Sequence, residues 1–529
     1  MFLFFIFFIE NADNVLESEF GACKQMTKKE QAQKNENPED NIEINTSLQE
    51  NLKILDDLFR DCSDIIINRL KTQSGKAACI IFIDGLVDTN IVQRDVVSKL
   101  IQLKETEMGQ LKEDNNIFPV VMNKRVFTME EVVDNTLSAY TVVLIDGINF
   151  AMCFPLMKMP LRSIEEPEVE RVIKGQHEGF VESTFTNITL IRGKFKSTKL
   201  KVKMMSIGKR SKSPVAMIYV EDIANPEIVK IIEDRIMSIE IDNINGAGYI
   251  DQLTADNPYS PFPHYQATER PDKAVANLME GRIVLLIDMT PVALIAPVNF
   301  FQFFQVSDDY NVNSYFGSFL RLLRFFGAFM AINLPALYIA ILTYHYQAVP
   351  LNLLVPLAES RSRVPFPPII EALIMEIAFE LLREASIRLP SSLGPTVGIV
   401  GGLVIGQTAI QAGIVSNIMV IIVGITAIAT FVVPQYDMAL LFRLGRFIAM
   451  INAAIFGIIG LIVFILFVLA HLVSLESVGQ PYFQPIAPLR IKDLKDVFVR
   501  LPLKMQKERP DIAKPLDKTR GRGNSNGTK

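Results

Sequence analysis

The chain has 529 residues, which is enough for roughly two to four domains, and 49% of them are hydrophobic. Charged residues are dense before about residue 280 and sparse from 325 to 471, a distribution that excludes a transporter spanning the bilayer along its whole length. The net charge of −5 indicates no particular partner, and the four cysteines fit neither a metal motif nor a disulfide framework, so we expect a reducing compartment.

The first 47 residues are predicted to be a disordered leader and linker. Residues 1–9 are apolar, but they lack the basic segment and the small-residue cleavage site of a signal peptide. Residues 24–47 are rich in Lys, Glu, Gln and Asn and contain almost no large apolar side chain, so this segment is unable to bury a core.

Two similar α/β lobes are predicted next, at residues 48–160 and 205–298, with residues 161–204 connecting them. Each contains an apolar strand, a turn and a helical pattern, followed by a hairpin-like pair of apolar runs. The expected strands lie at 77–83, 140–145, 150–155, 214–220, 282–287 and 292–297, and the expected helices at 48–59, 91–103 and 226–239. Both hairpins have an aspartate at the turn and end in proline, which indicates an internal duplication; chance similarity of apolar strands is the alternative.

A helical membrane domain is predicted at residues 299–475, ahead of a basic cytoplasmic tail at 476–529. Four segments are expected to cross the bilayer because they are uncharged and long enough. They are Phe325–Thr343, Leu393–Gln411, Ile414–Val433 and Phe447–His471. Pro335 predicts a kink in the first of them.

Basic residues predict the orientation of these crossings. Arg321 and Arg324 precede the first crossing and the basic tail follows the last, so both ends are expected on the cytoplasmic side. An even number of crossings, most simply four, then places residues 344–390 and 434–446 on the outer side. Two arginines in the second of these loops count against this topology.

An acidic amphipathic helix is expected before the second crossing. Glu376, Glu380 and Glu384 are spaced by four and therefore share one helix face, with Arg388 following. One interpretation is an interfacial helix with a solvated face and a Glu384–Arg388 pair. The other is that oligomerisation turns the three acids into rings at the mouth of a cation pore.

Glycines recur every fourth residue at the start of the second predicted crossing. They are Gly394, Gly398, Gly402 and Gly406. Because glycine at this spacing strips one helix face of side chains, the row predicts close packing against another helix, as is typical of helices within a bilayer.

Polar side chains interrupt the second and third predicted crossings. Gln407, Thr408, Gln411 and Asn417 are the pore-lining candidates among them. Hydrogen bonding between neighbouring helices is an equally good explanation of these residues.

The sequence contains no Walker loop, no G-x-S-x-G or H-E-x-x-H motif and no nucleophile with a positioned base. We therefore expect no enzymatic activity, no cofactor and no metal. The basic tail is expected to contact anionic lipid rather than nucleic acid, because it follows directly on a membrane segment.

Several stretches together resemble the A subunit of the spore germinant receptors, the GerA family, in family order from about residue 48 to about 512. The matching stretches are Glu178–Glu182, Asn187–Arg192, Tyr219–Asn225, Pro261–Pro263, Thr268–Asp272, Pro291–Pro297, Asp308–Tyr310, Val364–Pro367, Glu380–Ala385, Arg388–Pro390, Ile399–Gln407 and Pro481–Pro488. The chain departs from the family at Gln176 and His177, where Pro-Arg is usual, so a shared role for that loop is in doubt.

The resemblance implies a non-enzymatic receptor subunit in the inner membrane of an endospore, of class α+β, which triggers germination. It implies a transporter-like B subunit that takes the nutrient, a lipoprotein C subunit, and a homo-oligomer of A subunits around an ion path. Two alternatives stay open. A membrane-anchored scaffold would transmit the signal without its own pore, and a solute transporter component would show more crossings or inverted repeats.

Overall fold

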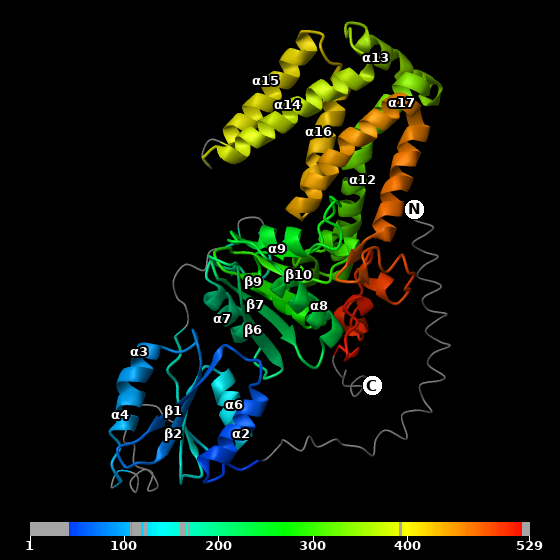
Figure 1. Cartoon of the computed structure of the whole chain (residues 1–529). Helices are drawn as coiled ribbons and strands as arrows, with labels where there is room; N and C mark the ends of the chain where they lie inside the picture. The colour runs from blue at the N-terminus through cyan, green and yellow to red at the C-terminus, as the bar shows by residue number, and fades with distance from the viewer. Residues whose placement is uncertain are drawn as a thin grey trace, which may run out of the picture.

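The structure is a computed structural model. It describes residues 42–105, 107, 118–120, 124–158, 166–167, 170–390 and 394–520. Three regions follow one another along the chain, and we name them the first lobe (48–154), the second lobe (184–296) and the helical region (314–474). The second lobe lies between the first lobe and the helical region (Figure 1).

The first lobe is a five-stranded sheet with helices packed against it. Its elements are α2 (Leu48–Leu58), β1 (Ile65–Lys71), β2 (Ala77–Ile83), α3 (Thr89–Ile91), a π-helical turn (Val92–Val97), α4 (Ser98–Ile101), β3 (Lys124–Val126), α6 (Met129–Leu137), β4 (Thr141–Ile145) and β5 (Ala151–Phe154). Residues 1–41 of the expected leader lie outside the described residues. Ordered contact begins before residue 48, because Ile44 is buried and its N–H donates to the Phe127 carbonyl oxygen at 2.9 Å.

The second lobe repeats this arrangement. Its elements are α7 (Thr184–Lys194), β6 (Leu200–Ile207), β7 (Ser213–Val220), α8 (Pro226–Met237), α9 (Ala247–Thr254), β8 (Gln266–Thr268), α10 (Pro271–Leu278), β9 (Ile283–Ile287) and β10 (Ala293–Ala296). The strand orders, β1-β2-β4-β5-β3 and β6-β7-β9-β10-β8, are the same in both sheets, which supports the duplication. Helix α7 and most of β6 precede residue 205, yet they pack in the core of this lobe.

Both lobes differ in one respect from the α/β type expected for them. Every strand pair in the two sheets is antiparallel, so each lobe is itself α+β. Short hairpins account for this in the β4–β5 and β9–β10 pairs, because parallel neighbours would need a long crossover.

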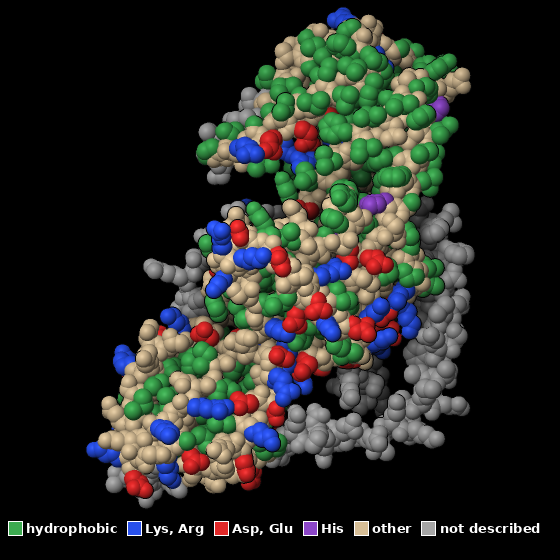
Figure 2. Space-filling model, viewed as in Figure 1, with side chains coloured by type: hydrophobic (Ala, Val, Ile, Leu, Met, Phe, Trp, Pro, Cys, Tyr) green, Lys and Arg blue, Asp and Glu red, His purple; other side chains and the backbone are tan. Residues whose placement is uncertain are grey.

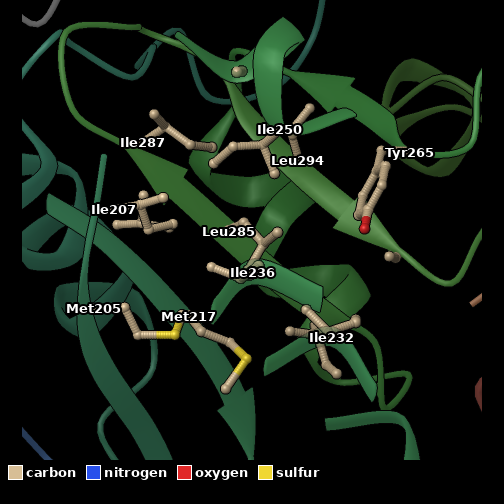
Figure 3. Close-up of a cluster of buried hydrophobic side chains, with 14 of the residues drawn as sticks. Met205, Ile207, Met217, Ile232, Ile236, Ile250, Tyr265, Leu285, Ile287 and Leu294 are labelled. Atoms are coloured by element: carbon tan, nitrogen blue, oxygen red, sulfur yellow. The ribbon is translucent and has the colours of Figure 1, made fainter. Parts of the chain in front are cut away.

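The apolar strand runs are uninterrupted because both faces of each sheet are covered. In β9, Leu285 and Ile287 face α8 and α9, where they meet Ile232, Ile236 and Ile250 (Figure 3). The alternate residues of β9 face α7 and α10 on the other side of the sheet. Helices on both faces therefore bury every second residue on each side.

A buried ion pair joins the two lobes. Arg192 of α7 donates from Nε and Nη2 to the two carboxylate oxygens of Asp64, at 2.7 and 2.8 Å. Both side chains are almost fully buried. Beside them, Val202 of β6 exchanges two backbone hydrogen bonds with Asp61 and Ser63, so the lobes are also linked main chain to main chain.

The described part of the helical region contains six α-helices. They are α12 (Ser314–Tyr344), α13 (Leu351–Arg361), α14 (Pro368–Arg388), α15 (Gly394–Gln411), α16 (Asn417–Phe431) and α17 (Tyr436–Ser474). Among the described residues, α12 and α17 are long and apolar enough to cross a membrane. Helix α12 begins eleven residues before the expected crossing and continues through Pro335.

Helix α17 reverses direction at Gly457, where φ is 64° and ψ is −142°. The two halves, 436–456 and 458–474, pack so closely beside the turn that a Cβ on Gly460 would overlap the Asn452 carbonyl oxygen. The expectation of one uninterrupted crossing from Phe447 to His471 was therefore wrong. Glycine adopts this backbone conformation without the strain that a side chain would cause.

Two further expectations are corrected. The loop at 434–446 was expected on the outer side, yet the Gln435 amide donates to Glu170 of the inter-lobe segment at 3.0 Å, because α16 returns to the lobes. Helix α14 is not a free interfacial helix, since it packs against α12, α15, α16 and α17. The tail packs on the second lobe, where the Leu516 N–H donates to the Ile223 carbonyl oxygen at 2.8 Å.

Breaking the inter-lobe pair is expected to destabilise the protein strongly. Asp64→Ala leaves the Arg192 guanidinium buried without a counter-charge, which costs about 3–5 kcal/mol. Thermal unfolding of the purified chain in detergent measures the loss. The control is Asp57→Asn in the exposed Arg60–Asp57 pair, where we expect a change of about 0–1 kcal/mol. Equal melting of the two variants would contradict a stabilising role for the buried pair.

The reversal of α17 is expected to require Gly460. In Gly460→Ala the new Cβ meets the backbone of Asn452, which has no flexible end that could move aside. We expect loss of folded protein, measured as the yield of monodisperse protein in detergent. Gly424→Ala in α16 is the matched control, because open space surrounds the Gly424 position. Gly460→Ala with wild-type yield and melting would mean that the two halves do not pack as described.

Candidate functional site in the helical region

Arg446 in the first half of α17 lies at the centre of the helical bundle. Its guanidinium is buried and donates to three other helices. Nη1 donates to Glu376 Oε2 of α14 at 2.5 Å, Nη2 to Thr430 Oγ1 of α16 at 2.7 Å, and Nε to the Ala331 carbonyl oxygen of α12 at 2.8 Å. Four helices are thus held in register by one side chain.

A second buried carboxylate, Glu371, lies five residues earlier on α14. Glu371 Oε1 accepts hydrogen bonds from the backbone N–H of Ser416, at 2.6 Å, and from the Ser416 hydroxyl. Its other oxygen lies 3.6 Å from Arg361 Nε. The Ser416 hydroxyl also meets the Tyr338 hydroxyl at 3.3 Å, so this carboxylate joins α12, α14 and the start of α16.

The three acids expected on one face of α14 have different surroundings. Glu376 is buried against Arg446, and Glu380 pairs with Arg443 of α17 at 2.9 Å. Glu384 is exposed and pairs with Arg388 at 2.6 Å, as expected. A single chain therefore offers an open acidic face only toward the C-terminal end of α14, because arginines of α17 occupy the rest.

The pore-lining candidates all face away from the bundle. Gln407, Thr408, Gln411 and Asn417 are exposed in the single chain. The Thr408 hydroxyl bonds back to the Val404 carbonyl oxygen of its own helix. None of the four lines an enclosed path within one chain, so a pore role for them requires neighbouring chains.

The glycine row is only part of the close contact between α14 and α15. A Cβ on Gly402 or Gly406 would make ordinary contacts, 3.8 Å from Phe379 and 3.5 Å from Val420. Gly401 makes the tightest contact, because a Cβ there would overlap Leu382 of α14. The surroundings of Gly394 and Gly398 lie outside the described residues. The spacing of four predicted close packing at Gly402, but the adjacent Gly401 makes the closer contact with α14.

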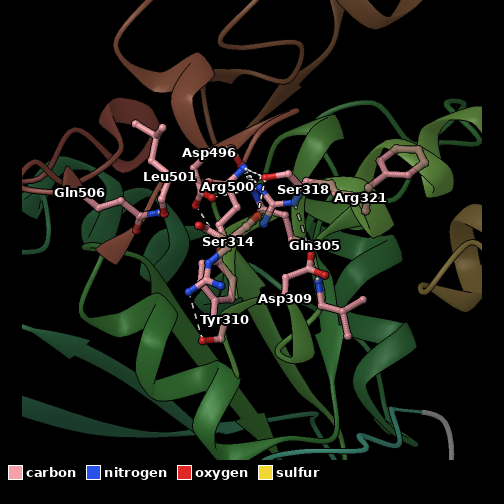
Figure 4. Close-up of polar contacts among 12 residues, drawn as sticks. Gln305, Asp309, Tyr310, Ser314, Ser318, Arg321, Asp496, Arg500, Leu501 and Gln506 are labelled. Carbon is pink, nitrogen blue, oxygen red and sulfur yellow. Dashed lines mark hydrogen bonds and ion pairs between the residues drawn. The ribbon is translucent and has the colours of Figure 1, made fainter. Parts of the chain in front are cut away.

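Charged residues connect the base of α12 to the lobes and to the tail (Figure 4). Arg324 donates to both oxygens of Asp309, at 2.5 and 2.8 Å, and Arg321 Nη1 donates to Asp496 Oδ1 of the tail at 3.0 Å. Asp309 and Arg321 are fully buried. The sequence suggested these arginines only as orientation signals, and their partners lie too far along the chain to be recognised from spacing.

Hydrophobic side chains cover the helical region, whereas charged side chains gather on the lobes (Figure 2). An apolar cavity of about 920 Å³ opens between α12 and both halves of α17, with Asn333, Asn452 and His471 among its few polar side chains. This surface suits lipid rather than polar chemistry.

Reactive groups are scarce among the described residues. No three His, Cys, Asp or Glu side chains there gather as a metal site would require. Burial raises the pKa of the Cys79 and Cys153 thiols to about 12, so both remain protonated and unreactive near neutral pH.

The sequence of the chain matches a known family. The family model described as "Bacillus/Clostridium GerA spore germination protein" matches residues 53–512. The chain belongs to the GerA family. The resemblance inferred from the sequence motifs is thereby confirmed.

Relatives of this GerA-family protein cover almost its whole length. Spore germination protein GerLA of Bacillus cereus is 38% identical over 483 residues, which are 90% of this chain and 98% of that protein. Spore germination protein B1 of Bacillus subtilis (strain 168) is 38% identical over 486 residues, 91% of this chain and 100% of that protein. The uncharacterized membrane protein YfkQ of Bacillus subtilis (strain 168) is 38% identical over 468 residues, 88% of this chain and 91% of that protein.

A solved structure also matches this GerA-family protein. It is the crystal structure of the N-terminal domain of the A subunit of the Bacillus megaterium spore germinant receptor GerK3. The match has 29% sequence identity and a TM-score of 0.38, and it covers 49% of this chain and 98% of that chain.

The Arg446–Glu376 pair of the GerA-family protein is expected to be required for the bundle. Glu376→Leu leaves a buried arginine without its counter-charge and should cost about 3–5 kcal/mol. The double variant Glu376→Leu, Arg446→Leu should recover part of this loss, because leucine suits an apolar interior. Thermal midpoints in detergent measure both effects.

Glu384→Gln is the control for that experiment. It removes one charge of an exposed helix pair and should change stability by about 0.5 kcal/mol or less. If Glu376→Leu melted like Glu384→Gln, the four helices would not depend on Arg446.

Proposed function

We propose that this GerA-family protein is the A subunit of a nutrient germinant receptor that triggers spore germination. The observation that carries the proposal is the match to spore germination proteins over about nine-tenths of both chains. The protein would act without enzymatic chemistry, together with a transporter-like B subunit and a lipoprotein C subunit, in the inner membrane of the endospore.

The arrangement of the chain ends supports a multi-pass topology with both termini on the cytoplasmic side. The tail contacts the base of α12 directly, since the Arg500 N–H donates to the Ser318 hydroxyl at 2.9 Å. The tail and the lobes therefore share one side, which an even number of passes requires. The reversal of α17 at Gly457 contributes to this parity by returning the chain to the lobes.

We further propose that several A subunits assemble with their α15 helices around an ion path. Gln407 and Gln411 are one turn apart and exposed, so they share a face that a neighbouring chain or a lumen must cover. Amide oxygens on that face offer coordination to a passing cation. Glu384 lies exposed on the adjoining helix α14, where it would raise the local cation concentration.

Replacing both glutamines tests the channel against a scaffold without a pore. Gln407→Leu with Gln411→Leu should keep folding and assembly and suppress cation release. The flux should fall to on the order of a tenth if the lost coordination costs the ion about 1.4 kcal/mol. Cation release from proteoliposomes that contain the A, B and C subunits measures the effect at matched oligomer yield.

Val404→Leu is the matched control, because Val404 is an exposed residue of the same helix and already apolar. It should conduct like the wild type. Unchanged flux in the double variant would remove the two glutamines from the path. Absence of flux in the wild type with all three subunits present would favour the scaffold.

A further inference from the structure

Helix α9 of the second lobe presents unpartnered apolar side chains on the side of the lobe that faces the helical region (Figure 1). Two belong to α9 itself and two to the loops beside it. They are Tyr249 (46% exposed), Leu253 (49%), Tyr259 (96%) and Met289 (76%), and we call them the α9 face. Large apolar groups gathered on one side of a soluble lobe mark an interaction surface.

The turns around α9 belong to one surface. A Cβ on Gly246, directly before α9, would lie 2.7 Å from Thr290, so the β9–β10 turn that carries Met289 abuts the start of the helix. The β6–β7 turn joins them, since the Lys209 N–H donates to the Ile241 carbonyl oxygen at 2.8 Å. Met289 is held on this surface by its own turn, with φ at 68°.

The α9 face adjoins the base of the candidate membrane helices. Ser260, next to Tyr259, meets His471 near the end of α17 at 3.0 Å. Exposed apolar residues continue along α17 on both sides of His471, at Leu469 and Val473. Tyr259 and Leu469 line the same apolar cavity, so the apolar surface of α17 adjoins Tyr259 of the α9 face.

Charge on this surface is consistent with a bilayer boundary. Lys209, Arg210 and Lys212 lie exposed on the β6–β7 turn, with two acidic neighbours, Glu240 and Asp242, beside them. Basic residues next to exposed aromatic and apolar side chains are typical of segments that lie at the lipid headgroups. Burial, together with the nearby charge of Asp437, raises the pKa of Asp251 on α9 to about 7, which favours a neutral carboxyl in this place.

We propose that the α9 face of the second lobe rests on the bilayer, with its apolar side chains at the headgroup boundary and the basic β6–β7 turn toward the phosphates. The inference rests on the membrane placement of α12 and α17. It adds a lipid-contacting surface to a part of the chain that has no membrane segment of its own.

The absence of tryptophan from the chain allows a direct test. A single tryptophan is introduced as Tyr249→Trp or as Leu253→Trp in the full chain, which is then reconstituted into bilayers with and without brominated acyl chains. Lipid contact predicts blue-shifted emission that brominated lipid quenches. The loss should be comparable to that of Phe326→Trp on the exposed apolar face of α12, within the expected crossing.

Phe127→Trp in the first lobe is the negative control, because Phe127 is similarly exposed and belongs to the lobe farther from the helices. Quenching at Tyr249→Trp and Leu253→Trp but not at Phe127→Trp supports the proposal. Emission at both α9 positions like that of Phe127→Trp overturns it, and so does blue-shifted emission without quenching, which would mean that protein covers the face. Loss of quenching at Phe326→Trp as well would instead overturn the membrane placement of α12 itself.

Discussion

The packing of the helical region depends on the buried charge of Arg446, which is unfavourable in a bilayer without a partner. An arginine in an apolar environment needs a counter-charge and acceptors for its N–H donors. Arg446 finds both among partners from three other helices. Displacement of any one of these helices would leave a buried donor or acceptor without a partner. The hydrophobic effect adds little specificity between helices in lipid, so this polar set determines which helix faces pack together.

Buried ion pairs also connect the helices to the rest of the molecule. Asp309 follows the second lobe, Arg321 and Arg324 lie in the first turns of α12, and Asp496 belongs to the tail. Because these charges are buried together, a rotation of α12 would have to separate opposite charges or carry the tail with it. The helical region and the second lobe are therefore mechanically coupled at α12, and the contact between Gln435 and Glu170 adds a second connection.

Central strands were recognisable from the sequence and edge strands were not. Strands such as β9 are buried on both faces and appear as unbroken apolar runs. Strands β1 and β6 lie at sheet edges and carry Asn68, Arg69, Lys201 and Lys203, so their patterns resemble loops. The acidic spacing on α14 was visible, but its meaning depended on an arginine 70 residues away. The break in α17 was hidden because Gly457 stands in an apolar run that continues on both sides. The turn becomes visible only in the packing of the two halves and of Gly457 against Tyr344.

The contact between the tail and the base of α12 has a consequence for how the protein is made. Ser318 and Arg500 are separated by 182 residues, and most of the helical region and the start of the tail lie between them. During synthesis the second lobe and α12 emerge early, whereas the tail that completes their junction leaves the ribosome last. Arg321 therefore lacks its partner Asp496 until every later helix has been inserted. This junction forms only after translation and membrane insertion are both complete. Its presence therefore distinguishes finished chains from truncated ones, which quality-control proteases degrade.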